Sequence, residues 1–229
     1  MKIMTFNILH CMNYSTKKID FSAFADEILS VGADIAGLNE VRGAGLLPGY
    51  TAQAKKLGEL TSMNHYFGKA ISVAGTSPYG NAILSRYPIT AEVFSVPDPK
   101  IKTGKEMYES RAVIRAVARA EKNYTVLVTH MGLNKDERIN AVKTVLSLAS
   151  DERCIIMGDF NCTPDAEELK PLFEAFNCSD TKDLTFPSDA PKKKIDYIFT
   201  SRDIEIIDKG TSENAVSDHL AQWIEIKEN

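Results

Sequence analysis

Short apolar runs rich in β-branched and aromatic residues recur along the chain, each bounded by Gly, Pro, Asn or Asp, a pattern typical of β-strands. They predict strands over residues 3–8, 35–38, 66–73, 81–84, 91–96, 112–120, 124–128, 154–157, 195–200, 204–207 and 221–226. Apolar residues three and four positions apart indicate helices over residues 21–31, 54–61, 138–149 and 167–176. Many strands and few helices predict two sheets packed on each other, with the helices outside.

One pair of neighbouring runs shows how such a sheet would be built. Arg111, Arg115 and Arg119 alternate with alanine and isoleucine, so this strand should have one buried and one wet face. The short polar segment 121–123 then leads into the apolar run 124–130. The two runs therefore predict an antiparallel hairpin that places His130 at a strand end.

Composition narrows the class of protein without identifying it. With 229 residues, of which 44% are hydrophobic and 25% charged, the chain fits one globular domain over residues 1–229. No run of about 18 apolar residues is present, which predicts no membrane span, and the first dozen residues lack the unbroken apolar stretch of a secretion signal. Four cysteines without a C-x-x-C pair favour the reducing cytoplasm over a disulfide scaffold or a zinc ribbon. Nothing in the sequence indicates a protein partner.

The net charge of −4 does not favour general binding to polyanions. A nucleic-acid substrate would have to be held by local basic residues. Two lysine-bearing segments, 97–109 and 192–194, either form a rim that attracts phosphate or are solvated loops, and the sequence leaves both readings open.

Polar residues suited to catalysis follow six of the apolar runs, where side chains of neighbouring strands can converge on one rim of a sheet. These segments are 4–7, 37–40, 128–130, 157–161, 194–196 and 217–219. Each alone is a common turn sequence. Asp159 and Asn161 are more specific, because residues two apart on an extended segment share a face and can address one water or metal.

The candidate ligands are mainly oxygens, and no helical His-x-x-x-His pair is present, so zinc is disfavoured. A set of Glu40, Asn7 and Asp218 would offer a few hard ligands and leave positions for water and a substrate oxygen, which suits Mg²⁺ or Mn²⁺. His219 follows Asp218 directly and could move a proton or stabilise an oxyanion. A phosphate ester is the natural substrate of such a site.

Seven motifs occur in a characteristic order along nearly the whole chain: Thr5-Phe-Asn-Ile8, Leu38-Asn-Glu-Val41, Gly80-Asn-Ala-Ile-Leu-Ser-Arg86, Val128-Thr-His130, Gly158-Asp-Phe-Asn161, Ile195-Asp-Tyr197 and Ser217-Asp-His219. In this set the chain resembles the endonuclease/exonuclease/phosphatase superfamily of divalent-metal phosphohydrolases, which includes pancreatic-type deoxyribonuclease. The resemblance implies an α+β fold, a four-layer α/β/β/α sandwich of two mostly antiparallel sheets, with the site at one edge of both.

The resemblance also implies a role for each matching residue. Glu40 looks like the main metal carboxylate, assisted by Asn7 and Asp218. Asp159 and Asn161 would flank the attacking water, while Asp196 resembles the carboxylate that orients His219. The remaining candidates would contact substrate: His130 at the scissile phosphate, Arg111 at a substrate phosphate and Asn81 through its amide. Whether Asp159 or His219 is the general base stays open at this stage.

The expected activity is Mg²⁺- or Mn²⁺-dependent hydrolysis of a phosphodiester by in-line water attack, with nucleic acid favoured over phospholipid headgroups. Leu9 stands where abasic-site endonucleases usually carry an acidic residue, which argues against that activity. The alternatives are a phosphomonoesterase acting on a small phosphorylated metabolite or inositol phosphate, and a catalytically silent binding domain. A silent member would usually have lost one of the catalytic positions, all of which are present here.

Overall fold

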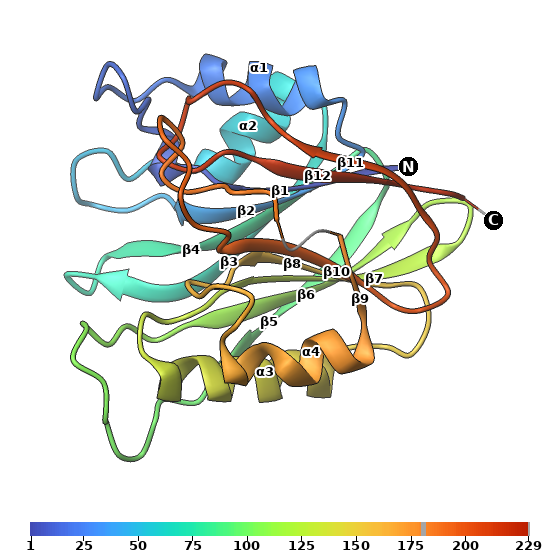
Figure 1. The fold of residues 1–229 in the computed structure, drawn as a ribbon. Helices are drawn as coiled ribbons and strands as arrows, with labels where there is room; N and C mark the ends of the chain where they lie inside the picture. The colour runs from blue at the N-terminus through green and yellow to red at the C-terminus, as the bar shows by residue number, and fades with distance from the viewer. Residues whose placement is uncertain (180–181, 229) are drawn as a thin grey trace.

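Two six-stranded sheets lie face to face in a computed structural model that describes residues 1–179 and 182–228 (Figure 1). Helices α1 (Phe21–Val31) and α2 (Gln53–Thr61) cover the outer face of the first sheet. Helices α3 (Lys135–Leu148) and α4 (Lys170–Ala175) cover the second. The predicted α+β four-layer sandwich is confirmed, whereas a single domain over residues 1–229 stays a prediction.

Each sheet combines one parallel strand pair with antiparallel neighbours, so the prediction of mostly antiparallel sheets is also confirmed. The first sheet has the order β11-β12-β1-β2-β4-β3 and the second has the order β5-β6-β7-β8-β10-β9. The strands of the first are β1 (Lys2–Asn7), β2 (Ile35–Arg42), β3 (Asn64–Val73), β4 (Ser77–Ser85), β11 (Ile206–Thr211) and β12 (Gln222–Ile226). Those of the second are β5 (Ile89–Ser95), β6 (Ala112–Arg119), β7 (Asn123–His130), β8 (Cys154–Asp159), β9 (Asn177–Cys178) and β10 (Asp196–Thr200). Two 3₁₀ turns, η1 (Leu9–Cys11) and η2 (Glu167–Leu169), complete the described elements.

The starts of α1 and α3 are marked by side chains that satisfy free backbone N–H groups. Asp20 accepts a hydrogen bond from the Ala23 amide at 3.1 Å, and α1 ends at Gly32 in the left-handed conformation. At α3, Asn134 and Glu137 form a reciprocal capping box. None of the described helices is long and apolar enough to span a membrane.

The alternation of side chains along each strand divides the interior into three apolar layers. Side chains between the two sheets include Ile3, Ile35, Ile83, Val128, Met157 and Ile198. Continuing along each of these rows in steps of two residues reaches Asn7, Asn39, Asn81, His130, Asp159 and Asp196. The inward rows therefore change from apolar to polar at one end of the sandwich, and that end is where the candidate site forms.

The predicted hairpin over residues 112–130 is confirmed, with Val113 paired to Thr129. The prediction that one face of the first strand is exposed to solvent is wrong for the first half of that strand. Val113 is completely buried in the apolar layer beneath α3, and the side chain of Arg111 is only 12% exposed. The short strand β9 was not predicted, and β11 lies two to four residues later than expected. These elements are set by packing against other segments, which local patterns do not encode.

Gly158 of β8 is paired with Thr129 of β7. Its φ is +148°, and a Cβ atom at this position would collide with the carbonyl oxygen of Thr129. Gly158→Ala is expected to lower the free energy of unfolding by more than about 3 kcal/mol, because φ strain and overpacking add. Gly75→Ala is a matched control at φ +72° with open space around it, where about 1–2 kcal/mol is expected. Urea unfolding measures both, and equal losses would contradict the account.

Candidate active site

One carboxylate oxygen, Asp159 Oδ2, lies at the centre of the polar cluster. It accepts a hydrogen bond from Asn7 Nδ2 at 3.1 Å, which joins β1 of one sheet to β8 of the other. The Nε2 atoms of His130 and His219 each lie 3.6 Å from the same oxygen. Its other oxygen accepts a hydrogen bond from the Asn161 amide at 2.9 Å. Four of the sequence-predicted residues therefore surround Asp159 directly.

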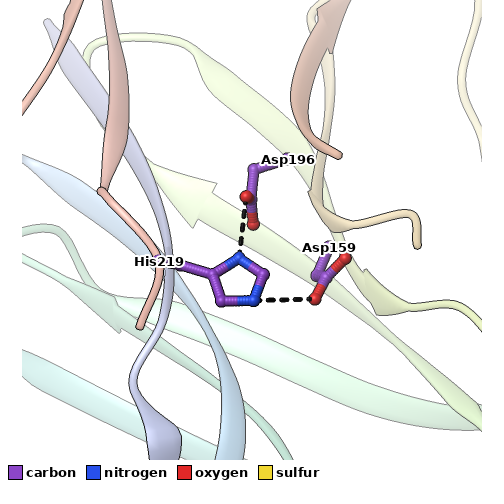
Figure 2. A group of neighbouring side chains, drawn as sticks. All are labelled: Asp159, Asp196 and His219. Atoms are coloured by element: carbon purple, nitrogen blue, oxygen red, sulfur yellow. Dashed lines mark hydrogen bonds and ion pairs between the residues drawn. The ribbon is translucent and has the colours of Figure 1, made fainter. Parts of the chain in front are cut away.

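His219 lies between two carboxylates, as Figure 2 shows. Its Nδ1 is 2.9 Å from Asp196 Oδ2, while its Nε2 faces Asp159. Asp196 and Asp159 are direct partners on β10 and β8, so the strand register fixes their spacing. The ring of Phe186 packs on the imidazole with centroids 4.8 Å apart, which restricts its rotation.

Charge and burial oppose each other in this group. Burial alone would lower the pKa of His219, but the carboxylates of Asp196 and Asp159 outweigh it and raise that pKa well above its ordinary value. Burial raises the pKa of Asp159, and the charge of Asp196 adds to the effect. For His130, burial and the charge of Arg111 lower the pKa to about 3. At neutral pH the site thus contains a cationic His219 and a neutral His130.

Glu40 reaches the site through an irregularity in its strand. Simple alternation from Leu38 would direct Glu40 away from the second sheet, but β2 carries a bulge between Leu38 and Val41, and Glu40 has φ +59°. Asn7 Nδ2 donates to Glu40 Oε1 at 3.2 Å. Burial would raise the pKa of Glu40, yet hydrogen bonding by His10 and Asn7 and the neighbouring histidines lower it to about 2.

Arg111, Asn81 and His130 line a small pocket beside the cluster, with a volume of about 10 Å³. Arg111 Nη1 lies 3.1 Å from Glu109 Oε1, while its Nε is buried and has no hydrogen-bond partner among the described residues. Asn81 Nδ2 donates to the Ala112 carbonyl at 3.0 Å. The pocket has room for about one oxygen-sized group.

Asn161 and Asp218 complete the predicted set at its margins. Asn161 has φ +53°, and its Nδ2 donates to the Met131 carbonyl at 2.9 Å. Asp218 is partly exposed and accepts from Ser217 Oγ at 3.1 Å. Burial raises the pKa of Asp218, an effect that the Glu40 charge reinforces, so these two carboxylates are electrostatic neighbours.

Asn39 was not predicted as a site residue, although it lies in the polar segment 37–40. Its carboxamide is completely buried, and Nδ2 donates to Asn81 Oδ1 at 2.8 Å and to the Thr129 carbonyl at 2.9 Å. Its Oδ1 accepts from the Asp159 amide at 2.9 Å. Asn39 therefore ties the two sheets together directly beneath the site. The sequence did contain a sign of this role, because Asn39 follows Gly37 by two residues and therefore continues an inward-facing row of β2.

A sequence profile of the Endonuclease/Exonuclease/phosphatase family matches residues 4–219. This chain belongs to that family. No curated protein sequence matches the chain. The solved structures it resembles share its fold at low sequence identity.

Three of these endonuclease/exonuclease/phosphatase structures illustrate how similar they are to this chain. One from Beutenbergia cavernae DSM 12333 has a TM-score of 0.81 and 19% identity, covering 99% of this chain and 71% of that one. A family protein from Leptotrichia buccalis C-1013-b has a TM-score of 0.78 and 20% identity, covering 99% of both chains. The human Nocturnin catalytic domain with bound sulfate anion has a TM-score of 0.73 and 17% identity, and the match covers 99% of this chain and 94% of that one.

Members of the endonuclease/exonuclease/phosphatase family hydrolyse phosphate esters and generally use a divalent metal. The residues here fit such an ion. Glu40 is ionised and 24% exposed, and Asp196 Oδ1 is a buried acceptor without a hydrogen-bond partner in the described part of the chain. Asp159, Asp196 and His219 place ligand atoms within 4.8 Å of one another, although a cationic His219 is a poor ligand. The predicted set of Glu40, Asn7 and Asp218 offers harder donors and remains a prediction.

Replacing Asn39 tests its bridging role. Asn39→Leu would leave the Asp159 amide, the Thr129 carbonyl and Asn81 Oδ1 without partners in a dry interior, where each such group costs about 1–3 kcal/mol. We expect the free energy of unfolding to fall by at least about 3 kcal/mol. Asn64→Leu is the matched control, because its amide also bridges two carbonyls but is exposed to water. Chemical denaturation that gives equal losses for both variants would exclude the bridging role.

Proposed function

We propose that this chain is a divalent-metal-dependent phosphodiesterase that cleaves its substrate by in-line attack of water, with nucleic acid favoured over phospholipid headgroups. One observation carries the proposal: Asp159 Oδ2 lies among Asn7, His130 and His219 in a buried cluster to which both sheets contribute residues. Phosphoryl transfer needs a positioned nucleophile and charge stabilisation in a water-poor site, and this arrangement provides both.

Asp159 and His219 are suited to opposite halves of the proton transfer. The raised pKa of Asp159 makes it a better base toward an attacking water than an ordinary carboxylate. The raised pKa of His219 keeps a proton on the imidazole, where it can stabilise or protonate developing charge. We therefore assign Asp159 as the base and His219 as the acid, with Asp196 holding the ring and Asn161 fixing Asp159 through its amide.

The other predicted residues contact the phosphate in this proposal. Arg111 and neutral His130 would donate hydrogen bonds to phosphoryl oxygens from the small pocket, with Asn81 supporting its wall. Glu40, with Asn7 and Asp218, would hold Mg²⁺ or Mn²⁺. When bound, such an ion would supply Lewis-acid stabilisation of charge on the phosphoryl oxygens. The human Nocturnin catalytic domain, which shares this fold, has a bound sulfate anion, a tetrahedral group like phosphate, and this supports the proposed phosphate-ester substrate.

Charge favours a diester over a monoester. Glu40, Asp159, Asp196 and Asp218 bring four carboxyl groups to the site, while Arg111 is already paired with Glu109. A diester has one negative charge at neutral pH and a monoester close to two, so the diester meets less repulsion.

All four cysteines are free thiols, which supports a reducing compartment such as the cytoplasm.

Hydrolysis of an aryl phosphodiester and the matching monoester tests the proposal. Turnover should require Mg²⁺ or Mn²⁺, stop in excess EDTA and be faster for the diester. Asp159→Ala should lower the rate by about 10²- to 10⁴-fold, the usual contribution of a positioned base. Lys143→Ala, an exposed change on α3, serves as the control. A near wild-type rate in Asp159→Ala would refute this mechanism.

A separate prediction concerns the metal. Glu40→Ala removes the ionised carboxylate that Asn7 orients, so half-maximal activity should need at least about tenfold more Mg²⁺. Activity should recover substantially at saturating metal, as titration of Mg²⁺ in the rate assay would reveal. A deficit that no metal concentration relieves would remove Glu40 from the ligand set.

A further inference from the structure

A cleft of about 820 Å³ opens beside His219, and none of the residues that line the Arg111 pocket lines it. It extends from Asn161 and His219 between the start of α3, the loop after β8 and the segment that carries Phe186 and Lys193. This volume accommodates a group the size of a nucleotide, whereas the Arg111 pocket has room for about one oxygen atom. The organic part of a substrate therefore has room in the cleft beside His219 and not in the Arg111 pocket.

The charges of this cleft differ from those of the catalytic cluster. Of its acidic residues, Glu168 pairs with Arg138 at 2.7 Å and Glu167 pairs with Lys170 at 2.8 Å. Lys135 and Lys193 also line the cleft, and neither has an ion-pair partner among the described residues. Lys135 also acts on Glu167 and lowers its pKa, although Glu167 already has Lys170 as its ion-pair partner. With these groups counted, four basic side chains face three carboxylates, which leaves a surplus of one positive charge.

The backbones of both lysines are held in place by the structure around them. Phe186 and Lys193 exchange backbone hydrogen bonds of 3.1 and 2.8 Å, and the Phe186 ring packs on His219. The backbone of Lys193 is therefore fixed relative to the catalytic imidazole. Lys135 is the first residue of α3, immediately after the capping residue Asn134.

We propose that this cleft binds a second phosphate of the substrate, next to the scissile one, through Lys135 and Lys193. Phe186 and Leu133 form apolar walls for the organic group that joins the two phosphates. The inference rests on the proposed function and narrows its substrate to organic phosphates with two neighbouring anionic groups, as in a nucleic-acid chain or a phosphorylated headgroup.

Calorimetric titration in excess EDTA tests this binding without turnover. The probes are adenosine 3′,5′-bisphosphate and inositol 1,4-bisphosphate, with adenosine 5′-monophosphate and inorganic phosphate as references. We expect at least one bisphosphate to bind about three- to tenfold more tightly than the references, the size expected for two partly solvated ion pairs. A preference for the adenosine compound indicates a nucleotide source, and a preference for the inositol compound indicates a headgroup.

Matched variants make the result specific. Lys135→Gln and Lys193→Gln should each weaken bisphosphate binding about two- to fivefold, and together abolish the preference. Lys143→Gln, an exposed change further along α3, should leave it intact. Equal affinities for mono- and bisphosphates, or a preference that survives the double substitution, would overturn the inference. If the lysine-dependent preference is found but no phosphate ester is hydrolysed, the proposed function fails and the binding site stands.

Discussion

A carboxylate buried between two sheets must be compensated by donors and cations, and this constraint organises the whole molecule. Asp159 is 1% exposed, and its partners come from β1, β7, the loop after β11 and the loop after its own strand. Because these groups belong to both sheets, packing the sheets together and assembling the site are one event. The Asn39 bridge beneath Asp159 strengthens that coupling, since it joins the backbones of β7 and β8 to β2.

Period-two alternation explains why so many of the site residues were predictable. Asn7, His130, Asp159 and Asp196 each continue an inward-facing apolar row, so any sandwich built from these strands brings them to the same gap. The four-layer architecture followed from the number of strands and helices and from the ordered motifs. Local patterns were thus sufficient wherever a residue's orientation follows from its neighbours along the strand.

The remaining features depend on contacts between distant segments. Glu40 faces the site only because β2 bulges, and the pattern of apolar residues contains no sign of that bulge. Arg111 was expected on a solvent-exposed face, but its side chain is largely buried next to Glu109. The packing of Phe186 on His219 joins two loops that are 33 residues apart. Each of these is a tertiary effect that overrides a local preference.

The site is electrostatically asymmetric, and this asymmetry links its chemistry to its selectivity. On one side, the carboxylates of Asp159, Asp196 and Glu40 favour a cation. On the other, a cleft with two lysines that have no ion-pair partner in the described part of the chain favours anions. Between them lies His219, whose proton is held by both aspartates. A phosphate ester placed across this boundary would have its reacting group near the carboxylates and its organic part beside the lysines.

The most direct test of this account is the position of a bound metal. Crystals soaked in Mn²⁺ and measured at the manganese absorption edge should show an anomalous peak within coordination distance of Glu40, with Asn7 and Asp218 as neighbouring donors. Such a peak, lost in Glu40→Ala crystals, would locate the catalytic ion as proposed. An occupied Mn²⁺ site that excludes Glu40, or no peak in this cluster at saturating Mn²⁺, would contradict the account.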